Sequence, residues 1–337
     1  MDQPAISIII PVKPGFRVTA AQRLATVDYP PDRYEVIVAE GYSPSRQRNA
    51  AVATARGEIV YFLDDDSLTL PGFLALAACH FKDPQVVAVG GPSLTPATDS
   101  LLQRSIGAAL ASVLGGGGMR NRYRAQGKAR LTSDSELILC NLSFRRERFL
   151  AFGGLDERLY PNEENELMDR MRQAGGGLIH DPQLAVYRSQ RPTWRLLCRQ
   201  FLNYGRGRAE QTLISRRMQP ASLIPAFFVV YVLFAPFFAN SRLCLPLAAY
   251  GLLVLAFSLR ESVTARCPGM FCRLPLIYAI IHLAYGAGLW RGVAGTLLGM
   301  RRKPGGEVAL RLIKEMDDPP GVLASRADSP SPSGSSG

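Results

Sequence analysis

The chain has 337 residues, of which 47% are hydrophobic and 20% charged, which excludes a wholly disordered or collagen-like protein. Its 39 Lys and Arg against 28 Asp and Glu give a formal net charge of +11, which favours an anionic partner. The basic residues gather beside apolar segments and do not alternate with aromatic side chains. This distribution favours lipid and phosphate as partners over nucleic acid.

Strands and helices alternate along the first part of the chain. Short apolar runs predict buried strands, at 6–12, 35–40, 58–63 and 86–91. The segments between them suit helices, at 17–27, 43–57 and 71–81. This alternation predicts a parallel α/β sheet, in which ligands bind at the carboxyl ends of the strands.

The pattern then weakens. Four consecutive glycines, 115–118, precede Arg120 and Arg122 and predict a mobile loop that closes over a ligand. The chain returns as a strand at 136–144 and as a helix at 163–174.

The last third of the chain is apolar. A helix at about 192–215 is expected to lie at the membrane surface, with its Arg residues near lipid phosphates. Three apolar segments follow, at 218–240, 243–259 and 274–290. The first is long enough to cross a bilayer, which takes about 20 residues, and the other two are short. We therefore predict a catalytic domain at 1–215, a membrane domain at 216–300 and a basic, then disordered, tail at 301–337.

The number of crossings stays open at this point. A cytosolic front domain sends the first segment out and the second back, which leaves the arginines between the second and third segments inside. A full third crossing would place the basic run at 301–303 outside, against the positive-inside tendency. Either the third segment is re-entrant or interfacial, or the tail lies outside.

Asp64, Asp65 and Asp66 directly follow the apolar strand IVYFL. Three carboxylates at the end of a buried strand repel one another, and a divalent cation would compensate them. Their oxygens suit Mg²⁺ or Mn²⁺, which commonly also hold a diphosphate. The spacing alone leaves open a solvated acidic turn that caps the helix near Pro71.

Glu163, Glu164 and Glu166 cluster at a predicted helix start, where the helix dipole favours carboxylates. Ordinary N-terminal helix charge accounts for such a cluster. A carboxylate that faces a metal-bound diphosphate would instead serve as a general base.

Taken in order, these segments resemble family 2 glycosyltransferases with a GT-A fold. The resemblance covers about residues 5–215 and is carried by SIIIPV, DYPPDRYEVIVAEG, RQRNAAVATARGEIVYFLDDDS, CNLSFRRERFLAFGGLDERL and ENEL. The segment RPTWRLLCRQFLNYGRGRA, followed by membrane helices, is most similar to the succinoglycan-type exopolysaccharide branch. The resemblance implies an α/β, Rossmann-like, mostly parallel GT-A domain followed by C-terminal transmembrane helices.

The resemblance also implies a role for individual residues. Asp64 and Asp66 match the metal-binding DxD pair, for Mn²⁺ or Mg²⁺, and Asp65 would lie beside the ribose and sugar. The other residues expected to bind the nucleotide sugar are Pro11, Val12, Glu40 and Arg48. The general base would be Glu164, or Glu163 if the register differs by one. The residues expected on the acceptor side are Asn141, Arg120 and Arg122.

Three departures from the family pattern stand out. The usual Glu-Asp pair is Glu163-Glu164 here, and the usual acid pair after the second strand is Ala39-Glu40. A His often found near the end of the domain is replaced around Tyr187 and Arg188. The metal would then rest on Asp66, the diphosphate and water.

The resemblance implies an inverting transfer of a sugar from a nucleotide-diphosphate sugar, usually a UDP-sugar. The expected acceptor is a glycan on a polyprenyl-diphosphate lipid, in polysaccharide biosynthesis. A multi-pass protein of the bacterial inner membrane is implied, with its catalytic domain in the cytosol and no nucleic-acid partner. Two alternatives stay open: direct transfer to polyprenyl phosphate, and a non-catalytic scaffold that binds nucleotide sugars.

Overall fold

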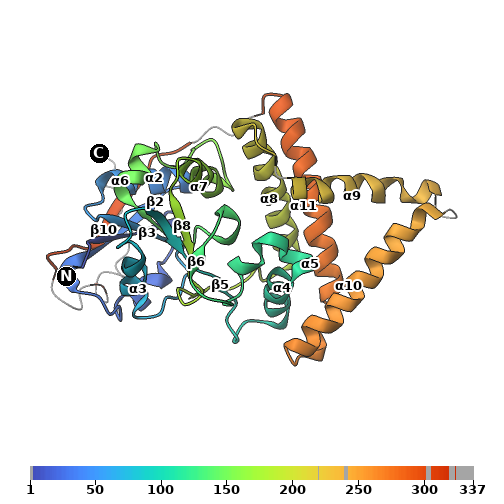
Figure 1. Cartoon of the computed structure of the whole chain (residues 1–337), viewed down its shortest axis with the longest axis horizontal. Helices are drawn as coiled ribbons and strands as arrows, with labels where there is room; N and C mark the ends of the chain where they lie inside the picture. The colour runs from blue at the N-terminus through green and yellow to red at the C-terminus, as the bar shows by residue number, and fades with distance from the viewer. Residues whose placement is uncertain (1–2, 219, 239–241, 301–304, 319–322, 324–337) are drawn as a thin grey trace.

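The protein, in a computed structural model, is described for residues 3–218, 220–238, 242–300, 305–318 and 323. Its centre is an eight-stranded sheet with the order β10-β2-β1-β3-β7-β4-β8-β6 (Figure 1). These strands are β1 (Ile6–Val12), β2 (Tyr34–Glu40), β3 (Ile59–Leu63), β4 (Val86–Gly90), β6 (Arg130–Leu131), β7 (Asn141–Arg145), β8 (Gly177–His180) and β10 (Ala309–Lys314). A small second sheet pairs β5 (Ser93–Leu94) with β9 (Val186–Tyr187).

The sheet is mixed. The pairs β1–β2, β1–β3 and β4–β8 are parallel, whereas β7 runs antiparallel between β3 and β4. The two edge strands, β10 and β6, are also antiparallel to their neighbours. The predicted α/β fold class is confirmed, and the acidic turn after β3 lies at a carboxyl edge as expected.

Helices cover both faces of the sheet, as the alternation of side chains along β1 requires. Ile8 packs in one core with α1 and α3, and Ile9 packs in the other core with α2, α6 and α7. The helices of this domain are α1 (Thr19–Leu24), α2 (Pro44–Thr54), α3 (Phe73–His80), α4 (Leu101–Ala111), α5 (Val113–Gly116), α6 (Arg146–Ala151) and α7 (Glu163–Gln173).

The glycine-rich segment differs from the mobile loop that we expected. It forms the short helix α5 and a 3₁₀ turn at Gly117–Arg122. A Cβ atom on Gly115 or Gly116 would overlap the carbonyl oxygen of Ala109 or Leu110. The glycines therefore allow close packing against α4, and the segment is not an open lid. The predicted strand at 136–144 is also shorter, because β7 begins only at Asn141.

The tail expected at 301–337 also differs. Residues 309–314 form β10, which extends the sheet by pairing with β2. Lys314 Nζ donates to the carbonyl oxygen of Tyr34 at 3.0 Å, which fixes the end of this strand. The sequence of β10 is a short alternation of apolar and basic residues, which explains why it was predicted to be part of a basic tail. Most of the residues predicted to be disordered lie outside the described residues.

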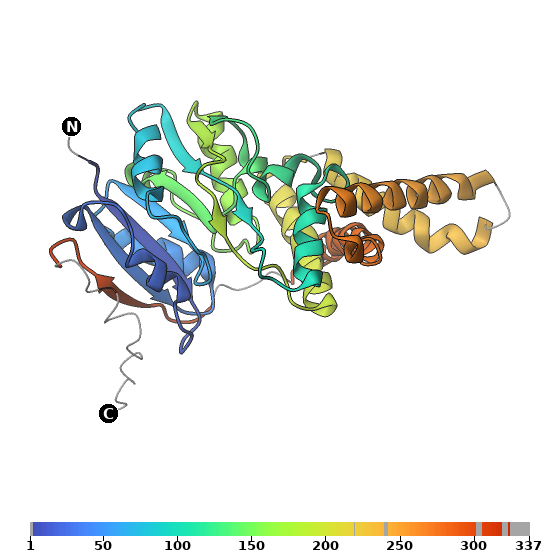
Figure 2. The same cartoon turned by 90° about the horizontal axis from the view of Figure 1, so that it is seen from below.

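Four further helices follow β9 in the described part of the chain: α8 (Trp194–Ser215), α9 (Leu223–Phe234), α10 (Leu245–Thr264) and α11 (Leu274–Leu297). Among the residues that the structure describes, three stretches are long and apolar enough to cross a membrane: Pro220–Phe237, Arg242–Thr264 and Pro268–Leu297. Helices α8 and α11 pack side by side, while α9 and α10 form a hairpin that projects away from the domain that contains the sheet (Figures 1 and 2).

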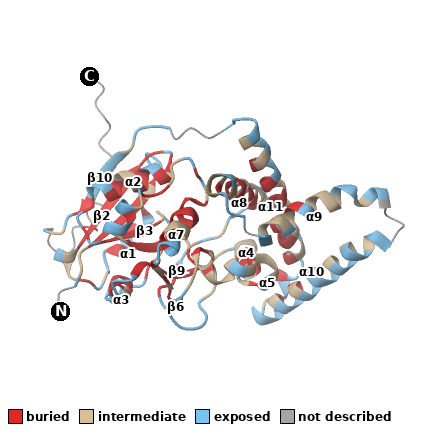
Figure 3. Cartoon of the chain, turned by 45° about the horizontal axis from the view of Figure 1, so that its top comes forward, coloured by how far each residue is buried: buried red, intermediate tan, exposed pale blue. Residues whose placement is uncertain are grey.

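The hairpin and α11 differ in burial. Only 6% and 11% of the first two apolar stretches are buried, against 39% of the third (Figure 3). Glycines bring α11 close to α8, because a Cβ on Gly205 would overlap the carbonyl oxygen of Tyr285, and one on Gly288 that of Leu202. Helix α11 is therefore covered by protein to a greater extent than the hairpin, which presents apolar side chains on its surface.

Candidate active site

The three aspartates leave β3 in a tight turn. The Ser67 amide donates to the Asp64 carbonyl oxygen at 3.1 Å, and the Asp64 amide donates to Ser67 Oγ at 3.2 Å. Ser67 Oγ also donates to the carbonyl oxygen of Cys140, next to β7. The turn places the carboxylate of Asp64 partly inside the protein and leaves that of Asp66 48% exposed.

Two arginines offset the charge of these carboxylates. Arg48, on α2, contacts Asp64 Oδ1 through Nη2 at 3.0 Å. Arg188, just after β9, contacts Asp64 Oδ2 at 3.1 Å and Asp66 Oδ1 at 2.7 Å. The repulsion expected from the sequence is thus relieved by guanidinium groups that come from two distant segments. From the sequence, Arg188 stood out only as a residue where a His is usual in the family, and its contact with the aspartates was not predicted.

Arg48 also reaches the glutamate cluster. Its Nη1 lies 3.6 Å from Glu163 Oε1, so one guanidinium group links Asp64 with the start of α7. Glu163 is 1% exposed. Its burial and the neighbouring charge of Glu164 raise the pKa of Glu163 from 4.5 to about 8, although Arg48 opposes the rise. The raised pKa favours the protonated form of Glu163, which makes it a poorer base than a carboxylate with an ordinary pKa.

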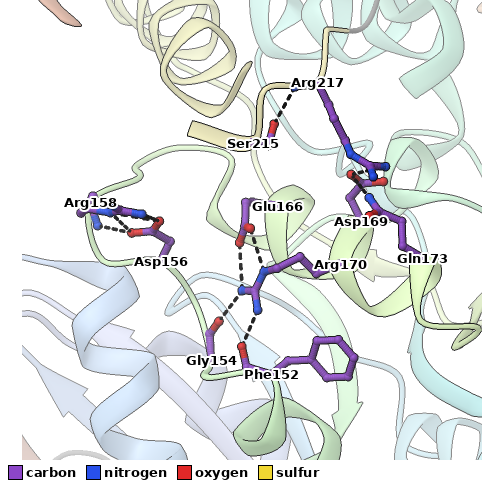
Figure 4. A network of polar contacts seen from close by, with 10 residues as sticks. All are labelled: Phe152, Gly154, Asp156, Arg158, Glu166, Asp169, Arg170, Gln173, Ser215 and Arg217. Carbon is purple, nitrogen blue, oxygen red and sulfur yellow. Dashed lines mark hydrogen bonds and ion pairs between the residues drawn. The ribbon is translucent and has the colours of Figure 1, made fainter. Parts of the chain in front are cut away.

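The three glutamates of the cluster have separate surroundings. Glu166 binds Arg170 through both carboxylate oxygens, at 2.7 and 2.9 Å, and Arg170 also donates to the carbonyl oxygens of Phe152 and Gly154 (Figure 4). Glu166 therefore fixes α7 to the preceding loop. Within the described part of the chain, the Glu164 carboxylate has no ion pair or hydrogen-bond partner. Glu164 is the member of the cluster with a carboxylate left for chemistry.

Helix α8 supports the loop before α7. Arg206 Nη2 donates to the carbonyl oxygen of Tyr160 at 2.9 Å. A Cβ on Gly207 would overlap the carbonyl oxygen of Pro161. The helix that we expected at the membrane surface is thus also part of the support of the glutamate cluster.

We expect Gly207→Ala to lower both the thermal stability and the activity, because the new methyl group must push α8 away from the loop. Overpacking of this kind costs about 1–3 kcal/mol. Gly251→Ala is the matched control, since Gly251 lies in α10 and a Cβ atom added to it would meet nothing within 4 Å. Thermal unfolding in detergent measures both variants. Equal melting temperatures for the two variants would contradict the close packing.

The residues expected to bind the base lie at the ends of two strands. Pro11 and Val12 end β1, and Glu40 ends β2. Gln47 Nε2 joins these ends by donating to the carbonyl oxygens of Val12, at 2.8 Å, and Ala39. Glu40 lies 3.7 Å from Arg311 Nε, on β10. Arg311 was not predicted from the sequence, because nothing in the local pattern indicates that this strand joins the sheet.

The residues expected on the acceptor side do not come together. Asn141 is fully buried, where its side chain accepts a hydrogen bond from Tyr61 and donates to the carbonyl oxygens of Pro92 and Leu184. Arg120 donates to the nearby carbonyl oxygen of Gly117. Both side chains are therefore engaged in contacts within the protein.

Arg122, by contrast, reaches the glutamate helix. Its Nη2 donates to Asn165 Oδ1 at 2.6 Å, directly after Glu164. The same nitrogen donates to the carbonyl oxygen of Asp134, also at 2.6 Å. Arg122 therefore connects the glycine-rich segment with α7.

Comparison with known proteins decides the family. Residues 59–290 match the profile of Glycosyl transferase family group 2, which covers most of the chain. The protein is a family 2 glycosyltransferase. It is 28% identical over 232 residues, 67% of each chain, to the succinoglycan biosynthesis protein ExoA of Rhizobium meliloti (strain 1021).

A solved structure supports the fold of this glycosyltransferase. The mannosyltransferase PcManGT from Pyrobaculum calidifontis, in complex with GDP-Man and Mn²⁺, superposes with a TM-score of 0.53 at 17% identity and covers 86% of this chain and 88% of its own. Residues 1–349 of S. aureus TarS, in complex with UDP, give 0.41 at 15% identity, with 88% and 92% covered. The predicted GT-A fold and membership of family 2 are confirmed.

GT-A glycosyltransferases commonly use a divalent metal, and a few side chains of this enzyme could serve as ligands for one. Within the described ranges, no three His, Cys, Asp or Glu side chains form a ready metal cluster. Asp66 is half exposed and offers carboxylate oxygens, the ligand type that Mg²⁺ and Mn²⁺ prefer. The residues fit a cation that takes one or two ligands from the protein and the others from phosphate and water.

Proposed function

We propose that this glycosyltransferase moves a sugar from a nucleotide-diphosphate sugar, a UDP-sugar, to a glycan on a polyprenyl diphosphate, with inversion at the anomeric carbon. The observation that carries the proposal is the double contact of Arg48 with Asp64 and Glu163. This contact joins Asp64, on the side proposed for the diphosphate, to the start of α7, where the proposed base Glu164 follows Glu163. The likeness to ExoA, a succinoglycan biosynthesis protein, supports a polysaccharide product.

The roles of the residues follow from this arrangement. Glu164 accepts the proton of the acceptor hydroxyl while the hydroxyl oxygen bonds to the anomeric carbon. The bond between that carbon and the diphosphate oxygen breaks, and the nucleoside diphosphate leaves with the bonding electrons. Arg48 and Arg188 lie at the side of the site where this negative charge develops, and preorganised charge of this kind lowers the barrier. Attack opposite to the leaving group inverts the anomeric carbon.

We propose that Asp66, together with Asp64, would hold a Mn²⁺ or Mg²⁺ ion. When bound, this ion would supply positive charge to the diphosphate. Pro11, Val12, Glu40 and Asp65 are proposed to line the nucleotide and sugar.

Nucleotide release from a panel of nucleotide sugars tests the proposal. We expect release from a UDP-sugar that requires Mn²⁺ or Mg²⁺ and increases when lipid-linked glycan is added. Asp66→Asn should lower this release severalfold. Transfer to polyprenyl phosphate without any lipid-linked glycan would indicate the priming reaction instead. No release from any donor, with acceptor supplied, would indicate a scaffold.

The path of the chain supports one topology for the proposed inner-membrane location. Helix α11 begins beside α4, where a Cβ on Gly269 would lie 3.0 Å from Leu101, and β10 after α11 belongs to the catalytic sheet. Both ends of α11 thus lie on the catalytic side. Helix α10, with 20 residues, is about 30 Å long, which matches the hydrocarbon thickness. We infer that the α9–α10 hairpin crosses the bilayer and that α8 and α11 lie along its cytosolic surface.

Single cysteines in a cysteine-free background test this topology. Arg242→Cys, near the hairpin turn, should react with a membrane-impermeant maleimide on intact cells from which the outer membrane is removed. Arg273→Cys, just before α11, should react only after lysis. Labelling of a cysteine at Leu310 from outside would overturn the assignment, because β10 would then be separated from the catalytic domain.

A further inference from the structure

Arg188 occupies the place where a cation would meet the aspartates. Its Nη2 lies 3.1 Å from Asp64 Oδ2 and its Nε lies 2.7 Å from Asp66 Oδ1. Arg48 takes the remaining oxygen of Asp64, at 3.0 Å. Three carboxylate oxygens of the proposed metal site are therefore already paired with guanidinium groups.

This pairing leaves a poor site for a free cation. Mg²⁺ requires near-octahedral coordination and is usually bound by one or two carboxylates together with substrate phosphates. In the described part of the chain, no third His, Cys, Asp or Glu completes such a cluster. A divalent ion that approached Asp66 alone would also meet the positive charge of Arg188, and the two would repel each other.

A bound nucleoside diphosphate would remove both the shortage of metal ligands and the repulsion between Arg188 and the cation. Its phosphate oxygens can accept hydrogen bonds from the guanidinium group of Arg188, because arginine binds phosphate through several N–H groups in a fixed fork. The same diphosphate offers oxygen ligands to the cation. Asp66 would then exchange the guanidinium group for the metal.

The two arginines differ in their freedom to make this exchange. The side chain of Arg48 is 5% exposed and lies between Asp64 and Glu163, so it has little room to move. The side chain of Arg188 is 24% exposed. Its backbone is fixed, since its amide donates to the carbonyl oxygen of Leu94 at 2.9 Å. The guanidinium head can therefore leave Asp66 while the strand stays in place.

We propose that Arg188 makes metal binding depend on the nucleotide: it pairs with Asp64 and Asp66 in the empty site and passes to the diphosphate when donor and metal bind together. Arg188 is a positioning residue in this scheme. The inference rests on the proposed function and adds an order to it, with little metal bound before the nucleotide. By linkage, the metal must strengthen nucleotide binding by the same factor as the nucleotide strengthens metal binding.

Mn²⁺ binding to the purified full-length protein in detergent tests this inference, followed by the electron paramagnetic resonance signal of free Mn²⁺. For the wild type we expect weak binding alone, and binding stronger by about tenfold or more with UDP, within the usual range of coupling between sites. Arg188→Gln should bind Mn²⁺ without UDP severalfold more tightly than the wild type, since two carboxylate oxygens are released. The gain from UDP should shrink in this variant.

Arg191→Gln is the matched control, because Arg191 is exposed on the same segment and pairs with Gln200. It should behave as the wild type. Tight Mn²⁺ binding by the wild type without UDP, or unchanged nucleotide-free binding in Arg188→Gln, would overturn the inference. If neither UDP nor GDP binds to any variant, the proposed function fails. The nucleotide-free comparison of wild type with Arg188→Gln then still decides the role of Arg188 at the carboxylates.

Discussion

Glu164→Gln is expected to lower the turnover number by about 10²–10⁴-fold, the usual contribution of a general base. The substitution keeps the shape of the side chain and removes its ability to accept a proton. Donor binding should be almost unchanged, because Glu164 has no contact with Asp64 or Arg48 among the described residues. Transfer rate and UDP affinity, measured on the same preparation, separate the two effects.

Glu163→Gln tests which of the two neighbouring glutamates is the base. Burial and Glu164 raise the pKa of Glu163 and favour its protonated form, which Gln imitates. We expect a much smaller loss of turnover than in Glu164→Gln. A larger loss in Glu163→Gln would transfer the role of base to Glu163, and unchanged turnover in Glu164→Gln would exclude Glu164.

The Glu163→Gln variant should also differ from the wild type in how its stability depends on pH. A carboxyl group whose pKa is raised on folding stabilises the folded state at low pH, and this contribution is lost as the pH rises through the folded value. For Glu163 the loss should develop between about pH 4.5 and pH 8. Glu163→Gln should flatten the fall in melting temperature over this range, relative to the wild type.

Arg48→Ala is expected to cause the second large effect, on both stability and donor binding. The side chain of Arg48 is 5% exposed, and its removal takes away one ion-pair partner of Asp64 and the guanidinium group that lies beside buried Glu163. Breaking a buried ion pair on one side costs about 3–5 kcal/mol. The variant should unfold at a lower temperature and bind UDP more weakly.

Arg46→Ala provides the comparison, because Arg46 is exposed on the same helix. It should unfold and bind UDP as the wild type does. Arg48→Lys should recover only part of the loss, since a single ammonium group cannot reproduce the two-sided contact of the guanidinium group. An Arg48→Ala protein with the stability and UDP affinity of the wild type would show that the link between Asp64 and Glu163 is unimportant.

Local patterns in the sequence determined much of this protein. The apolar runs at β1, β2, β3 and β4 are short and rich in β-branched residues, which favours buried strands over helices, so the alternating order and the position of the acidic turn follow directly. The helix from Glu163 and the long helix from Trp194 were likewise predictable, because their signals are contained within a few turns. The aspartates and glutamates could be singled out from the sequence alone.

Only the tertiary structure decided how these groups are paired. Arg188 meets Asp66 across 122 positions of the chain, and a lone arginine has no periodicity that would reveal its partner. The return of β10 to the sheet depends on free backbone groups at the edge of β2, and the packing of Gly207 on Pro161 depends on where α8 crosses the loop. Such contacts arise from strand register and helix packing, which join residues far apart in the sequence. They determine which carboxylate is buried, which is paired and which stays without a partner among the described residues.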